Sequence, residues 1–483
     1  MSTLGKYLYN LLYLLSNILF PVVTFAWAAR VLGPEGIGRV QIVLNLAQYF
    51  VMVAALGLSV YGVREVARVA GDRERLGRVF FALVTINLVT SLLMLGVYFV
   101  VVTATGWLAK DPGLYGVAGL LILTGFLTLD WFYTGVSRFG FLSLRSVVVK
   151  SLALAALFLF VRDRNDLLIY LAINVMTVVL TNLWNALEVS RMVRFSFRGV
   201  ALRSHFSGLG ILFLITLMVS IYTVADTLLV GYLAGERAAG LYTAAIRINK
   251  ILIPFIVALG TVLIPEITRS IDRNHEGRLR KLAGRSFAYL CLVGIPVSML
   301  LFAFAPEIMR IFSGAGFDDA VPAMRISALL PAMIGLGHLF GLQLLVSGGH
   351  EKKYLVAVTA GMVVSLILNF WLIPRMQEAG AAVAVTATEA VVTTICILFV
   401  FRIFKLSLSW SLAVTTLLVS LVFIPIAWLL RDWMTAPVWI LVIGVLASGA
   451  WFAGMQRLVI REPHLQELIL LLKEKIDIRR RGA

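Results

Sequence analysis

The sequence is short of charge and of cysteine. Only 14% of its 483 residues are charged, whereas about 25% of an average soluble domain is charged. The two cysteines, Cys291 and Cys396, both lie in apolar runs, so they are interpreted as small core residues and not as a redox or metal pair. This composition excludes a soluble globular protein, a disordered chain and a secreted disulfide scaffold.

Familiar catalytic motifs are missing as well. The sequence has no His-Glu-x-x-His zinc motif, no P-loop and no Gly-x-Ser-x-Gly with triad partners. The glycine-rich stretch 33–38 joins two apolar runs, and the external loops are too short for a glycosyltransferase or polymerase site. We therefore expect a protein that is not an enzyme and that uses no cofactor or metal.

What the sequence has in abundance is apolar residues. They make up 60% of the chain, and the mean hydropathy is +0.96. A membrane span needs about 20 apolar residues, and backbone in lipid must satisfy its hydrogen bonds internally. The predicted fold is therefore an all-α polytopic membrane protein with about 14 transmembrane helices. The runs bounded by charges are 5–29, 40–63, 79–105, 113–137, 141–161, 166–188, 207–234, 239–265, 286–306, 321–347, 354–374, 379–401, 408–430 and 436–456.

Basic residues are distributed unevenly over the connecting loops. The formal net charge is +17, and 30 of the 42 Lys and Arg residues lie at the two chain ends or in alternate loops. Cytoplasmic loops of membrane proteins collect Lys and Arg. The asymmetry predicts a multi-pass membrane protein with both termini cytoplasmic, and it removes the need for a nucleic-acid partner. Residues 461–483 read as a basic amphipathic helix on the cytoplasmic leaflet.

An internal repeat links the two halves of the chain. Gly38 matches Gly240 at an offset of 202 residues, and the pair Glu65 and Arg68 matches Glu266 and Arg269 at an offset of 201. Six runs separate the copies, an even number, so both would enter the membrane in the same direction, as in a parallel repeat. The predicted divisions are an N-terminal six-helix bundle (1–200), a second six-helix bundle (201–405), two further helices (406–460) and the basic tail (461–483).

A few polar residues interrupt the apolar runs. An embedded charge costs about 2.5–3.5 kcal/mol on insertion scales. Arg247 and Lys250 lie three residues apart on one helical run and share a face, and the repeat offset matches them to Asn45 and Gln48. We expect a polar cavity with a cationic wall that suits an anionic substrate. Alternatively, Arg247 and Lys250 pair with carboxylates and only hold the helices together.

Three embedded carboxylates are candidates for ion coupling: Asp226, Glu389 and Asp130. The chain has no nucleotide site, so transport would depend on an ion gradient or on downhill flow. Asp226 ranks first because an ion pair with Arg247 would couple substrate binding to protonation. Glu389 lies among small residues, which favours a structural hydrogen bond, and Asp130 could pair with Arg138.

Short motifs make the N-terminal part of the chain familiar. They are Asn17-Ile18-Leu19-Phe20-Pro21, Thr24-Phe25, the stretch Arg-Val-Leu-Gly-Pro-Glu-Gly-Ile-Gly from Arg30, Gln48-Tyr49-Phe50, Ala54-Ala55-Leu56-Gly57 and Tyr61-Gly62-Val63-Arg64-Glu65. A second set is Asp226, Gly231-Tyr232-Leu233 and Gly240-Leu241-Tyr242-Thr243-Ala244-Ala245. Together they resemble bacterial polysaccharide flippases of the O-antigen and teichoic-acid type, in the multidrug/oligosaccharidyl-lipid/polysaccharide exporter superfamily. Relatives often carry Pro-Tyr where Ala26-Trp27 stand here.

The resemblance implies a V-shaped transporter of two bundles. It would move a polyprenyl-pyrophosphate-linked oligosaccharide to the outer leaflet by alternating access, with the sugar in the polar cavity and the lipid tail in the bilayer. Its partners would be the lipid-linked oligosaccharide, membrane lipids, and a polysaccharide polymerase or glycosyltransferases. The predicted substrate-binding residues are Arg247, Lys250, Asn45, Gln48, Asn17, Asn249, Arg30 and Arg64.

Three other functions stay open. A peptidoglycan lipid-precursor flippase would share the cationic cavity. A cation-coupled multidrug exporter would take cationic substrates, which Arg247 and Lys250 should repel. A membrane polysaccharide polymerase or ligase would need a long external loop with catalytic groups, which the sequence lacks.

Overall fold

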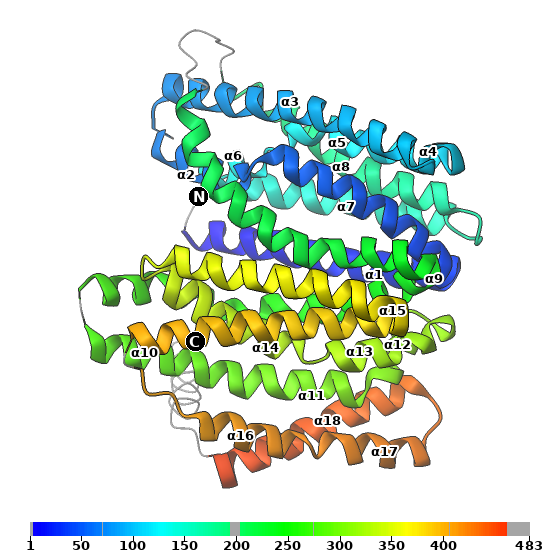
Figure 1. Cartoon of the computed structure of the whole chain (residues 1–483), viewed down its shortest axis with the longest axis vertical. Helices are drawn as coiled ribbons and strands as arrows, with labels where there is room; N and C mark the ends of the chain where they lie inside the picture. Colours follow the sequence, from blue (N-terminus) through cyan, green and yellow to red (C-terminus); the bar gives the residue numbers. More distant parts are fainter. Residues whose placement is uncertain (1–2, 70, 194–202, 274, 405, 461–483) are drawn as a thin grey trace, which may run out of the picture. The chain divides into compact units, whose positions relative to one another are not determined.

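The chain folds into long helices joined by short turns (Figure 1). The computed structural model describes residues 3–69, 71–193, 203–273, 275–404 and 406–460, and all regular structure in those ranges is helical. The predicted basic tail 461–483 lies outside the described residues. The chain divides into two compact units, unit 1 (Met1–Thr243) and unit 2 (Ala244–Ala483).

Unit 1 contains the first eight helices of the chain and the first part of the ninth. α9 begins in unit 1 and continues into unit 2. The elements of unit 1 are α1 (Thr3–Ala55), α2 (Leu58–Val69), α3 (Arg73–Ala104), α4 (Trp107–Lys110), α5 (Pro112–Leu123), the 3-10 turn Gly125–Leu127, α6 (Asp130–Gly135), α7 (Phe139–Phe160), α8 (Leu167–Val189) and the first part of α9 (Arg203–Asp272).

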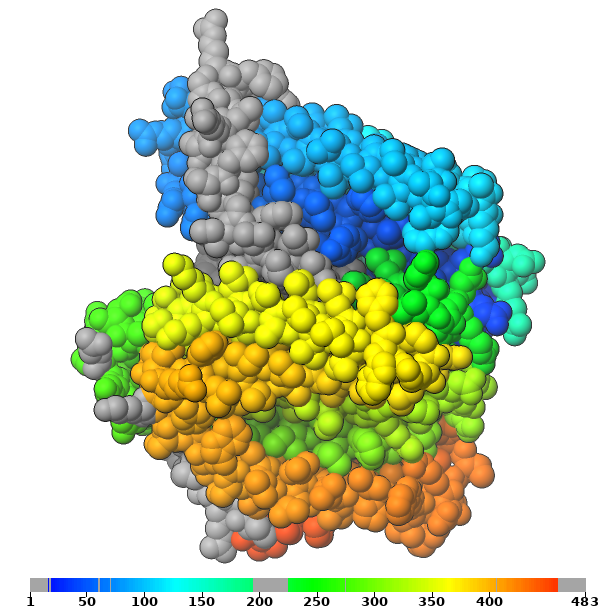
Figure 2. Space-filling model, in the orientation of Figure 1, coloured from blue at the N-terminus to red at the C-terminus, as the bar shows by residue number. Residues whose placement is uncertain are grey.

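Unit 2 contains the remaining helices, several of them interrupted by π-helical turns. On the face in Figure 2, the two halves of α15 lie side by side as a yellow and an orange band. The elements are the rest of α9, α10 (Glu276–Tyr289), the π-helical turn Leu290–Gly294, α11 (Ile295–Ala303), α12 (Ala305–Phe312), the 3-10 turn Ala315–Ala320, α13 (Val321–Ser327), α14 (Leu330–Gly337), the π-helical segment His338–Val346, α15 (Glu351–Ile403), α16 (Trp410–Ser420), α17 (Phe423–Trp433), α18 (Pro437–Met455) and the π-helical turn Gln456–Ile460.

Three of the longest helices are each two helices that meet at a kink. α1 breaks at Gly33, α9 at Gly235 and α15 at Gln377. Among the described residues, 10 helices are long and apolar enough to cross a membrane, or 11 when α5 and the bent segment after it count as one span. With the kinks taken as boundaries, each of the fourteen predicted runs falls on a helix or a short series of helices. The prediction of an all-α polytopic membrane protein is confirmed.

The exposed face of α3 is apolar, and its buried face includes polar side chains. On α3, Val89, Leu93 and Val100 are exposed, at spacings of about one and two helical turns. The buried face of the same helix carries Asn87 and Tyr98. Exposed aliphatic stripes of this kind suit lipid, because lipid is as apolar as the side chains that meet it. The polar groups of Asn87 and Tyr98 therefore lie inside unit 1.

Aromatic clusters fill the centre of each unit. In unit 1, Phe80 packs on Trp131 and Phe132, with ring centroids 6.1 and 5.0 Å apart. In unit 2, Phe304 packs against the α17 and α18 residues of its cluster, and a Cβ added to Gly444 of α18 would come within 2.2 Å of the Phe304 ring. This close approach shows that α17 and α18 pack against the rest of unit 2.

Candidate functional site

The two kinks that the repeat matches share one backbone conformation. Gly33 has φ 71° and ψ 179°, and Gly235 has φ 91° and ψ 177°. This region of φ and ψ is open essentially to glycine alone. The two positions are 202 residues apart, the offset that the motifs predicted.

Beyond the kinks, the two copies of the motif touch each other reciprocally within unit 1. A Cβ added to Gly38 would lie 1.7 Å from the carbonyl oxygen of Glu236 and 2.8 Å from the Gly240 nitrogen. A Cβ added to Gly240 would lie 1.8 Å from the carbonyl oxygen of Pro34. Because each glycine meets the carbonyl at the matching position of the other copy, the contact has local two-fold character. We call these four residues the glycine crossing.

Ion pairs surround the glycine crossing. Arg39 donates to both carboxylate oxygens of Asp111, and its Nε lies 3.1 Å from Oδ2. Glu236 lies 4.0 Å from Arg39 and 3.7 Å from Lys110. These contacts connect the two kinked helices to the turn before α5.

On the two kinked helices, predicted substrate-binding residues at matching positions of the repeat have the same degree of solvent exposure. Lys250 is exposed and Arg247 is partly buried, while Asn249 is fully buried and donates to Ser327 Oγ at 2.7 Å. At the matching positions of α1, Gln48 is exposed and Asn45 is partly buried. The structure therefore gives Arg247 and Lys250 a more open side of the helix, and it gives Asn249 a packing role in the core of unit 2.

The remaining predicted substrate-binding residues lie on α1 and α2. Arg30 is exposed on α1. Arg64 on α2 lies 3.4 Å from Glu65 and 5.4 Å from the Tyr61 ring centroid. The Asn17 side chain lies outside the described residues.

Two of the coupling candidates are deeply buried. Asp226 accepts a hydrogen bond from the Tyr242 hydroxyl at 3.0 Å, and both side chains are buried in unit 1. Glu389 is buried in the second half of α15, one turn from Val392. A Cβ added to Gly361 would come within 2.3 Å of Val392, so the halves of α15 pack closely beside Glu389.

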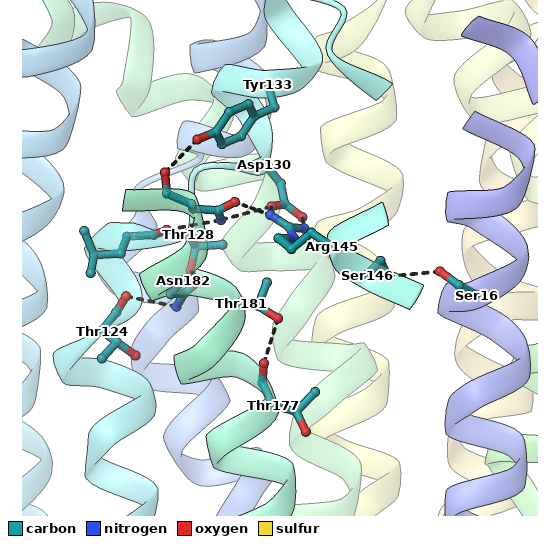
Figure 3. Close-up of polar contacts among 12 residues, drawn as sticks. Ser16, Thr124, Thr128, Asp130, Tyr133, Arg145, Ser146, Thr177, Thr181 and Asn182 are labelled. Atoms are coloured by element: carbon teal, nitrogen blue, oxygen red, sulfur yellow. Dashed lines mark hydrogen bonds and ion pairs between the residues drawn. The ribbon is translucent and has the colours of Figure 1, made fainter. Parts of the chain in front are cut away.

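The third candidate, Asp130, belongs to a hydrogen-bond network around the buried Arg145 in unit 1 (Figure 3). Arg145 of α7 is 2% exposed and donates to both Asp130 oxygens, at 2.9 and 3.3 Å, and also to Asn185 of α8. Asn185 accepts through its backbone carbonyl from the Tyr133 hydroxyl at 2.6 Å. Arg138, the expected partner of Asp130, pairs with Glu188 at 3.0 Å. The network neutralises a guanidinium that would otherwise be very costly to bury.

Sequence reasoning missed Arg145 as an embedded charge. We counted it among the basic residues of a cytoplasmic loop, although the predicted run 141–161 already contained both Arg145 and Lys150. An arginine and a lysine inside one apolar run were the available signal. The partner could not be foreseen, because Asp130 lies on a separate short helix.

Unit 2 has a smaller polar cluster at its π-helical segment. Gln343 accepts from Ser286 Oγ at 2.9 Å and its amide nitrogen lies 3.0 Å from His338 Nδ1. A Cβ at Gly260 of α9 would come within 2.0 Å of the Gln343 amide, so only glycine leaves room for it. π-helical turns often occur at functional sites. Over the described ranges, no group of three or more His, Cys, Asp and Glu side chains could hold a metal ion.

Comparison with known proteins places this architecture in a family. A family model described as polysaccharide biosynthesis protein matches residues 4–271, and the MatE model matches residues 212–371. A protein of Escherichia coli (strain K12) that is named for O-antigen transport is 25% identical over 410 residues, which are 81% of this chain and 96% of that protein. A protein of Haloferax volcanii named as a low-salt glycan biosynthesis flippase is 27% identical over 176 residues, 36% of this chain and 37% of that protein.

Solved structures show the same fold. The lipid II flippase MurJ in an inward closed conformation has a TM-score of 0.71 at 15% identity, covering 94% of this chain and 100% of that one. An inward-facing MATE family transporter of the MOP superfamily has a TM-score of 0.65 at 17% identity, covering 80% and 94%. Since the first family model covers more than half of the chain, this protein belongs to the polysaccharide biosynthesis protein family.

Proposed function

We propose that this protein is a flippase that moves a polyprenyl-pyrophosphate-linked oligosaccharide across the bacterial cytoplasmic membrane by alternating access. The observation that carries the proposal is the pair Arg247 and Lys250 on a partly open side of α9, in a chain of the polysaccharide biosynthesis family. The relatives named for O-antigen transport and glycan flipping support the same reading.

The chemistry of the pair fits an anionic substrate. A guanidinium binds two oxygens of one phosphate in a planar fork, and an ammonium adds a point charge beside it. Asn45 and Gln48 offer only neutral hydrogen bonds at the matching positions of α1. We therefore assign the phosphates or acidic sugars to Arg247 and Lys250, and neutral hydroxyl groups to Asn45 and Gln48.

Export of surface polysaccharide in a flippase-deletion strain tests the assignment. Arg247→Ala should abolish export at normal protein level, and Arg247→Glu should be at least as severe, because a carboxylate repels the anion. Arg375→Ala is the control, since this exposed arginine donates to a backbone carbonyl of its own helix. Normal export by Arg247→Ala at normal expression would show that the site is wrong.

The same strain set distinguishes the open alternatives. A multidrug exporter would restore resistance to cationic dyes and leave polysaccharide unchanged. A peptidoglycan lipid-precursor flippase would rescue cells that lack lipid II flipping. Restoration of polysaccharide alone supports the proposed substrate class.

We also propose that both termini are cytoplasmic. The support is the basic asymmetry of the sequence. Single cysteines at residue 272 should be shielded from a membrane-impermeant thiol reagent in intact cells, whereas cysteines at 236, 318 and 376 should react. Labelling of residue 272 from outside would overturn the orientation.

For the energy source, we propose that Asp226 exchanges a proton or Na⁺ during transport. The support is an intramembrane carboxylate next in sequence to the helical segment that carries Arg247. Flipping in proteoliposomes should accelerate under a pH or Na⁺ gradient for the wild type and not for Asp226→Asn. A wild-type rate that ignores both gradients would leave downhill flow as the driving force.

A further inference from the structure

A cationic pocket lies in unit 2 where α9 ends and α10 begins. Its volume is about 240 Å³. None of its residues belongs to the substrate-binding set proposed above. The lining residues are Glu266, Arg269, Ser270, Arg273, His275 and Arg278.

The pocket carries a surplus of positive charge. Arg278 lies 3.3 Å from Glu266, the single carboxylate of the lining. Within the described part of the chain, Arg269 and Arg273 form no ion pair. The repeat-related loop of unit 1 differs, because there Arg68 lies 2.9 Å from Glu65 and Arg75 lies 3.2 Å from Asp72. Two guanidinium groups in the unit 2 pocket are thus available to an anion.

The backbone reinforces the attraction for an anion. α10 has 14 residues and begins at Glu276, directly after His275. No side chain caps its first amides, so their positive end faces the turn that lines the pocket. Arginine side chains and a helix N-terminus on one turn form the usual surroundings of a bound phosphate.

The pocket lies at the depth of lipid headgroups. The apolar run of α9 ends at residue 265, and a helix rises about 1.5 Å per residue. Arg269 therefore lies about 6 Å beyond the hydrocarbon edge, within a headgroup layer that is roughly 5–8 Å thick on each side. Arg273 directly follows the end of α9 at Asp272. An arginine side chain reaches this layer from either position.

A second cavity adjoins the first, and its lining combines apolar side chains with the charged side chains of Glu276 and Arg280. Its volume is also about 240 Å³, and Ser270 lines both cavities. Ile271 and Leu279 form part of this groove together with Phe404, which follows the end of α15. A cationic pocket beside a groove that is apolar along Ile271, Leu279 and Phe404 matches a phosphate joined to a hydrocarbon chain better than it matches a free phosphate. All lining residues belong to unit 2, so the site is complete within one unit.

We propose that this pocket binds the phosphate of an anionic phospholipid headgroup, with the start of an acyl chain in the adjoining groove. Arg269 and Arg273 contact the phosphate, and the first turn of α10 donates its amides. The lipid is a resident ligand of unit 2, distinct from the transported lipid-linked oligosaccharide.

Native mass spectrometry and lipid titration of the full-length protein in detergent test the proposal. The wild type should bind phosphatidylglycerol and not phosphatidylcholine. Each basic side chain near an anionic lipid surface contributes about 1 kcal/mol, so Arg269→Ala/Arg273→Ala should weaken phosphatidylglycerol binding about 30-fold. Arg75→Ala, in the repeat-related loop of unit 1, is the matched control and should bind as the wild type does.

Two further arms keep the test decisive. The headgroup alone, sn-glycerol-1-phosphate, should bind far more weakly than phosphatidylglycerol, and equal affinity would mean that the groove is unused and the lipid assignment is wrong. If the double variant fails to fold, Arg273→Glu, which changes one exposed side chain, replaces it. Unchanged phosphatidylglycerol binding by a folded variant would overturn the site.

Discussion

The glycine crossing makes a sharp prediction for Gly38→Ala. A Cβ at this position would lie 1.7 Å from the Glu236 carbonyl oxygen, whereas real Cβ atoms stay beyond about 3.0 Å. The obstacle is a backbone atom and cannot rotate away, so the two helical segments must move apart by about 1.3 Å. Overpacking of this kind costs about 1–3 kcal/mol, and we expect the upper end because no side chain can yield.

The measurement is thermal unfolding of the purified protein in detergent. For a unit of this size, about 3 kcal/mol corresponds to a fall in Tm of roughly 6–12 °C. Gly96→Ala on α3 is the matched control, since nothing lies within 4 Å of the added Cβ. That substitution should leave Tm unchanged or raise it, because alanine is the better helix former.

Because the two glycines contact each other's segments reciprocally, a double variant gives a second test. Once Gly38→Ala has separated the crossing, Gly240→Ala meets less resistance, so the double variant should lose less stability than the sum of the single variants. Additive losses would show that the two contacts are independent. A Tm of Gly38→Ala equal to that of the wild type would refute the geometry of the crossing itself.

Three further predictions concern buried ion pairs and one exposed cap. Asp130→Ala leaves the buried Arg145 without its carboxylate and should lower the free energy of unfolding by about 3 kcal/mol. Glu188→Ala removes one partner of an exposed pair and should lower it by about 0–1 kcal/mol. Equal losses of stability in thermal unfolding would contradict this prediction. Glu307 accepts hydrogen bonds from Arg431 of α17 at 2.7 and 2.8 Å. Glu307→Ala should lower the free energy of unfolding by about 3–5 kcal/mol and expose α17 to proteolysis. Protease resistance equal to that of the wild type would contradict this prediction. The backbone amides of Arg75 and Glu74 donate to the Asp72 carboxylate and lower its pKa below the ordinary value of 3.8. The Asp72 cap therefore stabilises α3 fully at a pH above 3.8, and this stabilisation is lost as the pH falls through the lower pKa of the folded state. In the wild type, hydrogen exchange in the first turn of α3 should accelerate as the pH falls through the folded-state pKa of Asp72. In Asp72→Asn, which has no carboxyl group to titrate at this position, the same fall in pH should cause no such acceleration.

The sequence by itself determined the class of fold and its repeat. Apolar runs of about 20 residues leave helices as the only way to satisfy backbone hydrogen bonds in lipid. The matched glycine motifs also marked the two kinks, because a positive φ with extended ψ is open essentially to glycine. The sequence paired Gly38 with Gly240, and at the same offset the structure shows the kinks at Gly33 and Gly235.

Tertiary structure alone decided which side of each helix faces the core and which charge meets which. On α3 both the lipid-facing and the core-facing sides are largely apolar, so hydrophobic periodicity could not separate Leu93 from Tyr98. The partner of Arg145 lies 15 residues earlier on another helix, and that of Glu307 lies 124 residues later. Such pairings depend on how helices pack, since a buried charge selects whichever opposite charge the packing brings within hydrogen-bond distance.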